Sequence, residues 1–266
     1  MDLENLFLKL GYTKEEYEKI VSSYQLNRLK KETLYDKVLE NYKFLLSLGY
    51  TREEVIRMTK TLPSIYGYSI ENMKQKIEDI MLLGYTREDV IKITKTLPSI
   101  YGYSIENMKQ KIIDIMSLGY TREEVIRMTK TLPSLYAYSI ENMKQKIEDI
   151  MSLGYTREEV IKMTKSHPTL YGYSIENIRQ KITFYDSIDM HELAIIDSKR
   201  LIQSVDLSYA RYIFYREKGI EISMNNYGSL FISNKQFEKS YGITKKELLE
   251  KYNYRRYMEE QNDRII

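Results

Sequence analysis

Residues 51–85 read TREEVIRMTKTLPSIYGYSIENMKQKIEDIMLLGY, and nearly the same 35 residues return from Thr86, Thr121 and Thr156. The first and third copies differ only where Ile65, Gly67 and Leu82 become Leu135, Ala137 and Ser152. Self-similarity at a fixed period of this length is the signature of a stacked repeat protein, in which each unit buries its apolar side against its neighbours. The repeated stretch therefore decides the fold.

The ends of the helices within one copy follow from local chemistry. Thr51 and Glu54 form a capping box, which predicts the start of a first helix. That helix must end near Pro63, because proline lacks the N–H donor and disfavours a helical residue before it. A short turn is expected over 63–68, and Ser69 is expected to cap a longer second helix. Glycines that favour the left-handed conformation end the second helices, at Gly49, Gly84, Gly119 and Gly154.

The flanking segments extend this pattern. We predict an all-α fold, a superhelical α-solenoid of helix–turn–helix repeats of about 35 residues closed by atypical capping units. A shift of 35 residues aligns Val160 and Ile161 with Ile195 and Ile196, which predicts a degenerate fifth repeat. Two short helices are expected after it, followed by a polar tail, Tyr254–Ile266. The predicted segments are 1–47 (a worn N-terminal repeat), 48–187 (four full repeats), 188–218 (the fifth repeat) and 219–266 (a helical cap with the tail).

Composition excludes several classes of protein. The 41 basic and 38 acidic residues nearly cancel, and cysteine is absent, so no disulfide or cysteine-based zinc site is expected. His167 and His191 are the only histidines, and no glycine-rich phosphate loop or metal-binding motif occurs. We therefore expect a non-enzymatic protein without cofactor or metal. With no signal peptide and no apolar stretch long enough to cross a membrane, a soluble, cytoplasmic monomer is predicted.

The repeated charges separate into those that a helix explains and those that it does not. Glu53 and Arg57 stand four residues apart in the favourable order, which predicts a surface ion pair in every repeat. Two rows of cations remain without such a local partner. The lysine row consists of Lys60, Lys95, Lys130 and Lys165, and the 35-residue shift adds Arg200 to it. The arginine row consists of Arg52, Arg87, Arg122 and Arg157.

Either row has a structural and a functional interpretation. A lysine near a helix C-terminus is favoured by the helix dipole, and the arginines have acids within reach on the preceding helix. Alternatively, helices packed about 8–10 Å apart repeat a cation at a spacing that meets a phosphate strand at about every third nucleotide. Such a row grips the backbone and reads little sequence. Tyr66, Tyr68 and their copies either stack on bases or, as the pattern favours, pack at the edge of the core.

The repeated pattern resembles the mitochondrial transcription termination factor (mTERF) family. The resemblance is carried by Leu48-Gly49-Tyr50-Thr51 with Glu54 and Val55, then by Pro63 and Tyr68-Ser69-Ile70-Glu71-Asn72, over about 48–187. The uniformity of the copies favours a bacterial or recently duplicated member. The resemblance implies a right-handed superhelix with a basic groove that binds nucleic acid, duplex DNA more than RNA, in transcription. It implies phosphate contacts by the lysine and arginine rows.

Two functions stay open at this point. The first is a nucleic-acid-binding solenoid that grips backbone phosphates through its groove. The alternative is a scaffold that binds other proteins on the same concave face, as many α-solenoids do.

Overall fold

The computed structural model describes residues 2–23, 26–28 and 30–254, and all regular secondary structure in these residues is helical. The helices group into two compact units that divide between Tyr138 and Ser139. The first unit contains α1 (Leu3–Leu10), α2 (Lys14–Val21), α3 (Lys31–Ser47), α4 (Arg52–Thr61), η1 (Pro63–Gly67), α5 (Ile70–Leu82), α6 (Arg87–Thr96), η2 (Pro98–Gly102), α7 (Ile105–Met116), α8 (Arg122–Thr131) and η3 (Pro133–Ala137).

The second unit continues the same alternation and then closes it. It contains α9 (Ile140–Met151), α10 (Arg157–Ser166), η4 (Pro168–Gly172), α11 (Ile175–Asp186), α12 (Leu193–Ile196), η5 (Ser198–Ile202), α13 (Val205–Glu217), η6 (Tyr227–Phe231), α14 (Asn234–Tyr241) and α15 (Lys245–Lys251). The all-α repeat fold predicted from the sequence is confirmed.

The predicted caps form as the sequence pattern indicates. Thr51 accepts from the N–H of Glu54, whose carboxylate accepts from the N–H of Thr51, and the same capping box opens α2, α6, α8, α10 and α15. The turn that begins at Pro63 is a 3-10 helix, and Ser69 caps α5 through the N–H of Asn72. Gly84 has a φ of 109°, a left-handed conformation that glycine adopts without steric cost.

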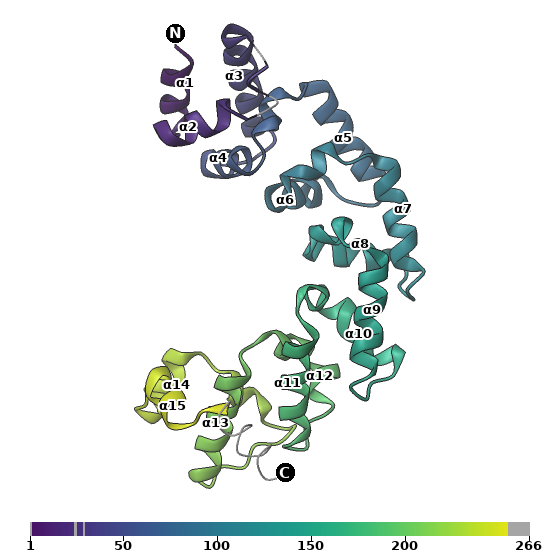
Figure 1. Cartoon of the computed structure of the whole chain (residues 1–266), viewed down its shortest axis with the longest axis vertical. Coiled ribbons are helices and arrows are strands. Elements are labelled where there is room, and N and C mark those ends of the chain that lie inside the picture. The colour runs from purple at the N-terminus through teal and green to yellow at the C-terminus, as the bar shows by residue number, and fades with distance from the viewer. Residues whose placement is uncertain (1, 24–25, 29, 255–266) are drawn as a thin grey trace. The chain divides into compact units, whose positions relative to one another are not determined.

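Within the first unit the helices form two rows. The first helices α4, α6 and α8 lie along one side, and α3, α5 and α7 lie along the other (Figure 1). Residues such as Val55 and Met58 on α4 and Met73 and Ile77 on α5 are buried between the rows. Because every repeat presents the same stripe, the core is continuous along the stack of this unit.

Buried hydroxyl triads connect neighbouring repeats. The Tyr85 hydroxyl lies 2.6 Å from Thr129 Oγ1 and 2.5 Å from the Tyr136 hydroxyl, both in the copy that begins at Thr121. Thr129 gives its proton to the carbonyls of its own helix, at 2.8 Å from Val125 O. Tyr85 therefore donates to Thr129 and accepts from Tyr136, so that each hydroxyl of this triad has a hydrogen-bond partner. The same triad recurs at Tyr12–Thr59–Tyr66 and Tyr50–Thr94–Tyr101.

The fifth repeat is shorter than the 35-residue shift implies. Its first helix, α12, spans only Leu193–Ile196, and Ser198 begins the 3-10 helix that Pro168 begins in the fourth repeat. The alignment of Ile195 and Ile196 with Val160 and Ile161 is therefore wrong, because about a turn of helix has been lost before η5. Asp189 stands where the full repeats have glycine and keeps a positive φ of 55°.

A C-terminal cap closes the second unit. Arg211 is buried, and its guanidinium donates to Leu230 O, Ile232 O and Asn234 Oδ1. Phe237 on α14 and Leu248 on α15 are buried. Tyr254 donates to Gln180 O, so the first residue of the predicted polar tail is packed against α11, and the rest of that tail lies outside the described residues.

Candidate nucleic-acid interface

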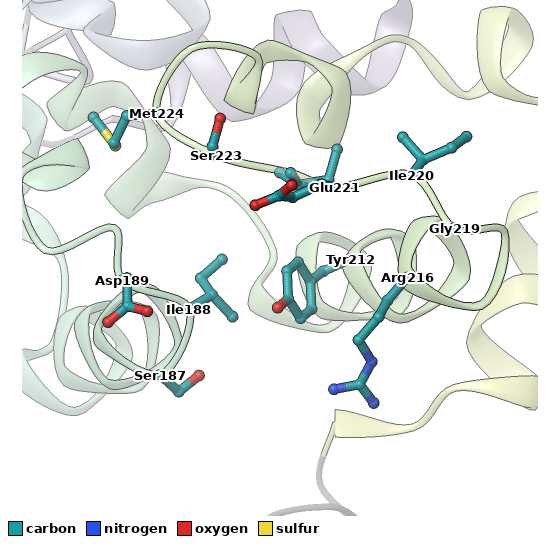
Figure 2. Close-up of a pocket in the computed structure, with 11 residues that line it drawn as sticks. Ser187, Ile188, Asp189, Tyr212, Arg216, Gly219, Ile220, Glu221, Ser223 and Met224 are labelled. Carbon is teal, nitrogen blue, oxygen red and sulfur yellow. The ribbon is translucent and has the colours of Figure 1, made fainter.

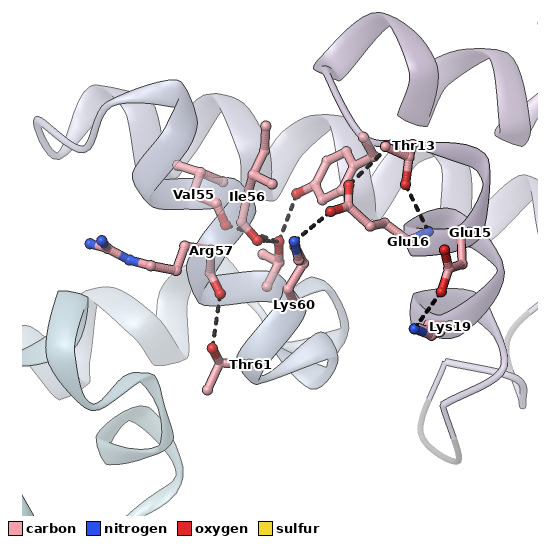
Figure 3. A network of polar contacts seen from close by, with 11 residues as sticks. Thr13, Glu15, Glu16, Lys19, Val55, Ile56, Arg57, Lys60 and Thr61 are labelled. Atoms are coloured by element: carbon pink, nitrogen blue, oxygen red, sulfur yellow. Dashed lines mark hydrogen bonds and ion pairs between the residues drawn. The ribbon is translucent and has the colours of Figure 1, made fainter.

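The lysine row lies near the C-terminal ends of the first helices, and each lysine in the first unit meets an acid of the preceding repeat. Lys95 Nζ lies 3.0 Å from Glu54, and Lys130 Nζ lies 2.7 Å from Asp89. Lys60 forms the corresponding pair with Glu16 (Figure 3). Each of these acids is also the capping-box residue of its own helix. The lysines therefore fasten one first helix to the next.

The lysines of these pairs remain partly open to solvent. The side chains of Lys60, Lys95 and Lys130 are 46%, 28% and 32% exposed. Lys95 and Lys130 also lie 5.8 and 5.9 Å from the ring centres of Tyr50 and Tyr85, within range of a cation–π contact. Ion pairs with this exposure contribute little to stability, so a phosphate that approaches the row competes with the carboxylate for the ammonium group.

Both the lysine and the N–H of the cap lower the pKa values of the acids in these pairs. The Lys60 ammonium, helped by the N–H of Thr13, lowers the pKa of Glu16. For Glu54 the N–H of Thr51 is the main cause of a lowered pKa, and Lys95 adds to it. Burial opposes ionisation of Asp89, yet Lys130 and the N–H of Thr86 leave its pKa lowered.

Two members of the arginine row, Arg52 and Arg122, donate hydrogen bonds to carbonyls at the C-terminal ends of other helices. Arg52 donates from Nε to Leu10 O at 2.7 Å and from Nη2 to Lys9 O, and Arg122 donates to Leu83 O at 3.0 Å. These carbonyls belong to helix C-terminal turns, where a cation complements the helix dipole. Arg87 and Arg157 hold the same position on α6 and α10. An acid on the preceding helix is thus not the partner of Arg52 or Arg122.

Arg200 does not occupy the lysine position. It lies in η5 rather than at the end of a first helix, because the fifth repeat is shortened. Its Nε donates to Asp197 at 2.8 Å, and its guanidinium lies 4.2 Å from the ring centre of Phe231. The sequence alignment that placed Arg200 in the row is corrected by this geometry.

A third row of cations lies on the first helices, between the arginine and lysine rows in sequence. The mid-helix row consists of Arg57, Lys92, Arg127 and Lys162, all exposed. Sequence analysis predicted that each pairs with the acid four residues earlier, and this is wrong. Across residues 2–23, 26–28 and 30–254 no side chain of this row forms a hydrogen bond or ion pair. Figure 3 shows the Arg57 guanidinium extended away from the pair of Lys60 and Glu16.

The sequence analysis missed the mid-helix row because it gave these cations a local partner. An i,i+4 pair on a helix surface is worth only about 0.2–0.5 kcal/mol, too little to hold two long side chains together. The available signal was the capping acid. It is fixed by the cap, recurs in every repeat and offers the lysine row a partner in the neighbouring repeat.

The two rows of helices differ in charge. Every first helix of the four repeats holds three basic and two acidic residues, as α4 does with Arg52, Arg57 and Lys60 against Glu53 and Glu54. The second helices hold two basic residues and two or three acidic ones. One of those bases turns inward: Lys76 donates to Tyr103 O, and Lys111 donates to Tyr138 O at 2.7 Å. Positive charge therefore concentrates on the first helices.

The tyrosines do not offer an open stacking platform. Tyr66, Tyr101, Tyr136 and Tyr171 are buried, which confirms the interpretation that they belong to the core. Burial raises the pKa of Tyr12, their partner in the first triad, to about 12. Tyr68 and Tyr103 are half-buried.

A cavity of about 470 Å³ lies in the second unit between α13 and the loop that follows it. Tyr212, Arg216, Asp189 and Glu221 line it (Figure 2). The lining holds one cation and two carboxylates, a composition that does not favour phosphate. Among the described residues no cluster of three or more His, Cys, Asp or Glu is arranged to hold a metal ion.

Comparison with protein-family models identifies a family for this chain. In the described part of the chain, no helix is both long and apolar enough to cross a membrane. A search of curated proteins returned no match. The mTERF family model matches residues 2–82 and 80–194, a range that holds all four full repeats and the three cation rows of their first helices. The chain therefore belongs to the mTERF family of helical-repeat proteins that bind nucleic acid.

Proposed function

We propose that this protein is a non-enzymatic binder of duplex DNA that grips backbone phosphates with the cations of its first helices. The observation that carries the proposal is the mid-helix row, in which four exposed cations recur at one position without an ion pair to any residue that the structure describes. A cation that is already solvated and unpaired gives up no protein contact when it meets a phosphate. Release of counterions from the duplex then supplies the free energy of binding.

The lysine row supports the same surface. Arg57 and Lys60 stand three residues apart on α4, so the two rows run beside each other on the first helices. In the proposal, the lysines exchange their carboxylates for phosphate when DNA binds. Arg52 and Arg122 stay on their helix carbonyls and hold the first helices in position.

Two features favour a duplex over a single strand. Proteins that bind single strands combine a basic groove with aromatic rings on which bases stack. In this chain Tyr66 and its copies Tyr101, Tyr136 and Tyr171 are buried, so they offer no such rings. The cation rows are also almost identical from repeat to repeat, which suits a regular phosphate backbone and gives little sequence preference.

Fluorescence anisotropy tests the proposal. The probes are a duplex DNA of about 30 base pairs, the matching duplex RNA and the single strands, at about 50 to 200 mM salt. One variant replaces the mid-helix row by alanine. Its matched control replaces Lys74, Lys109, Lys144 and Arg179 by alanine, which removes the same charge from the second helices.

We expect the mid-helix variant to reduce the slope of log K against log salt by about 3 to 4, since each lost phosphate contact contributes about 0.9. The control variant should bind nearly as the unaltered chain does. Absence of binding at low salt, or equal loss in both variants, would show that these cations do not form the site. Tighter binding of single strands than of duplex would contradict the duplex assignment.

A further inference from the structure

Two positions break the repeat in the same chemical sense. Leu82 stands where the second and third copies of the repeat have Ser117 and Ser152, and Ile113 stands where α5 and α9 have Glu78 and Glu148. In each case a polar residue has become a large apolar one. Neither change serves the core, because the Leu82 side chain is 83% exposed and Ile113 is 55% exposed.

These positions lie on neighbouring helices of the first unit. Leu82 is at the end of α5 and Ile113 is on α7, and these second helices pack side by side (Figure 1). Met81, which is 38% exposed, adds to the same stretch. Met81, Leu82 and Ile113 form what is here termed the outer apolar patch. Neighbouring packed helices lie about 8–10 Å apart, close to the length of two turns of an α-helix.

The charges around the patch are acidic. On α5 the acids are Glu71, Glu78 and Asp79, and on α7 they are Glu106 and Asp114. Lys76 and Lys111 donate to backbone carbonyls and keep their charge, so the two helices carry five acids against four bases, a net charge of −1. Lys74 and Lys109 are the remaining exposed bases of the two helices. A partner with basic residues beside an apolar stripe complements this surface.

We propose that the outer apolar patch docks an amphipathic helix of a partner protein, with a lysine- or arginine-rich polar face and apolar side chains about two turns apart. Such a helix places one apolar residue against Leu82 and Met81 and the next against Ile113. Its bases meet the acids of α5 and α7. The surface is separate from the cations of the first helices, so the protein can hold DNA and a partner at once.

The two substitutions Leu82→Ser and Ile113→Glu provide the test, because each restores the residue that other repeats carry at the same position. The double variant should therefore fold with an unchanged thermal transition. The probes are two labelled peptides of about 20 residues with the same leucine stripe at helical spacing, one with a lysine polar face and one with a glutamate polar face. The control variant is Ile196→Ser, which removes an exposed apolar side chain from α12 in the second unit.

We expect the lysine-faced peptide to bind the unaltered chain at least about tenfold more tightly than the glutamate-faced peptide. The double variant should lose that binding by about tenfold or more, since it forfeits the burial of two large apolar side chains. Ile196→Ser should leave binding unchanged. Because Ile113→Glu adds an acid, binding driven by charge alone would become tighter in the double variant, and that result would overturn the proposal.

Two further readouts keep the inference independent of the proposed function. Duplex DNA affinity should be the same in the double variant and in the unaltered chain. If sedimentation shows that the unaltered chain self-associates and the double variant does not, the patch binds a second copy, and the proposal of a basic partner helix fails. Equal affinity for both peptides overturns it as well.

Discussion

Lys130 Nζ lies 2.7 Å from Asp89 Oδ2, the same oxygen that accepts the N–H of Thr86 at 2.9 Å. One carboxylate thus closes the N-terminus of α6 and holds the lysine of the next first helix, α8. A single acid therefore caps the N-terminus of one helix and makes the contact between two repeats. Because Glu16 and Glu54 do the same for Lys60 and Lys95, the interlock recurs along the first unit.

Removing this acid should cost more than an ordinary surface ion pair. We predict that Asp89→Ala lowers the free energy of unfolding by about 1 to 2 kcal/mol, through loss of the cap and of the pair with Lys130. A double-mutant cycle with Lys130→Met should isolate about 0.2–1 kcal/mol for the pair itself. Urea unfolding measures both. Lys92→Met on the same helix is the control, with an expected change within about 0.5 kcal/mol.

Acid should weaken the interlock. The pKa values of Glu16, Glu54 and Asp89 are lowered in the fold, so their contribution to stability is present above the unfolded-state values near 4 and is lost as the pH falls through the folded-state values. We expect the urea midpoint to decline from about pH 5 downward. Glu54→Gln should flatten that decline, and an unchanged slope in this variant would contradict the assignment.

The buried triads should dominate the polar contribution to the core. We predict that Tyr85→Phe costs about 1–3 kcal/mol, because it leaves the hydroxyls of Thr129 and Tyr136 without their shared partner away from water. Thermal or urea unfolding measures the change. Tyr103→Phe is the matched control, because its half-exposed hydroxyl makes no hydrogen bond among the described residues. A similar loss in both variants would show that the triad has no special weight.

The sequence predicted the helix ends, which depend on local chemistry. It did not predict the ion pairs, for which residues distant in the sequence compete. The Thr51 cap, the break at Pro63 and the left-handed Gly84 each follow from one or two residues, and all are seen in the structure. Pairing of charges does not follow in this way. Glu54 lies within reach of Lys95 only because the repeats stack, and no spacing within one helix reveals that contact.

The predicted alignment of the fifth repeat failed for a different reason. Its apolar residues recur at the 35-residue shift by coincidence with a shortened helix, and Arg200 was carried into the wrong position as a result. Ser198 begins η5 where Pro168 begins η4, so the true shift there is 30 residues, and the short apolar pair of Ile195 and Ile196 does not distinguish it from 35. The alignment of apolar residues alone therefore could not detect the deletion.

His167 supplies the last prediction, because it replaces the leucine found at Leu62, Leu97 and Leu132. Its Nδ1 lies 2.8 Å from Ser198 Oγ, and partial burial lowers the pKa of its imidazole, although Asp197 opposes the change. The fold therefore favours the neutral ring. The stability from this residue is present above the unfolded-state pKa near 6.5 and is lost as the pH falls through the lower folded-state value.

We expect the unaltered chain to lose stability between about pH 7 and 5, above the range in which the carboxylates titrate. His167→Leu should remove that part of the pH dependence, because leucine fills the position in other repeats and carries no proton. Thermal unfolding across this range measures the difference. His191→Asn controls for the other histidine, which stacks on Tyr155 and bonds to Asp186. If the pH dependence of stability changes with His191→Asn and not with His167→Leu, the effect belongs to His191 and the prediction is refuted.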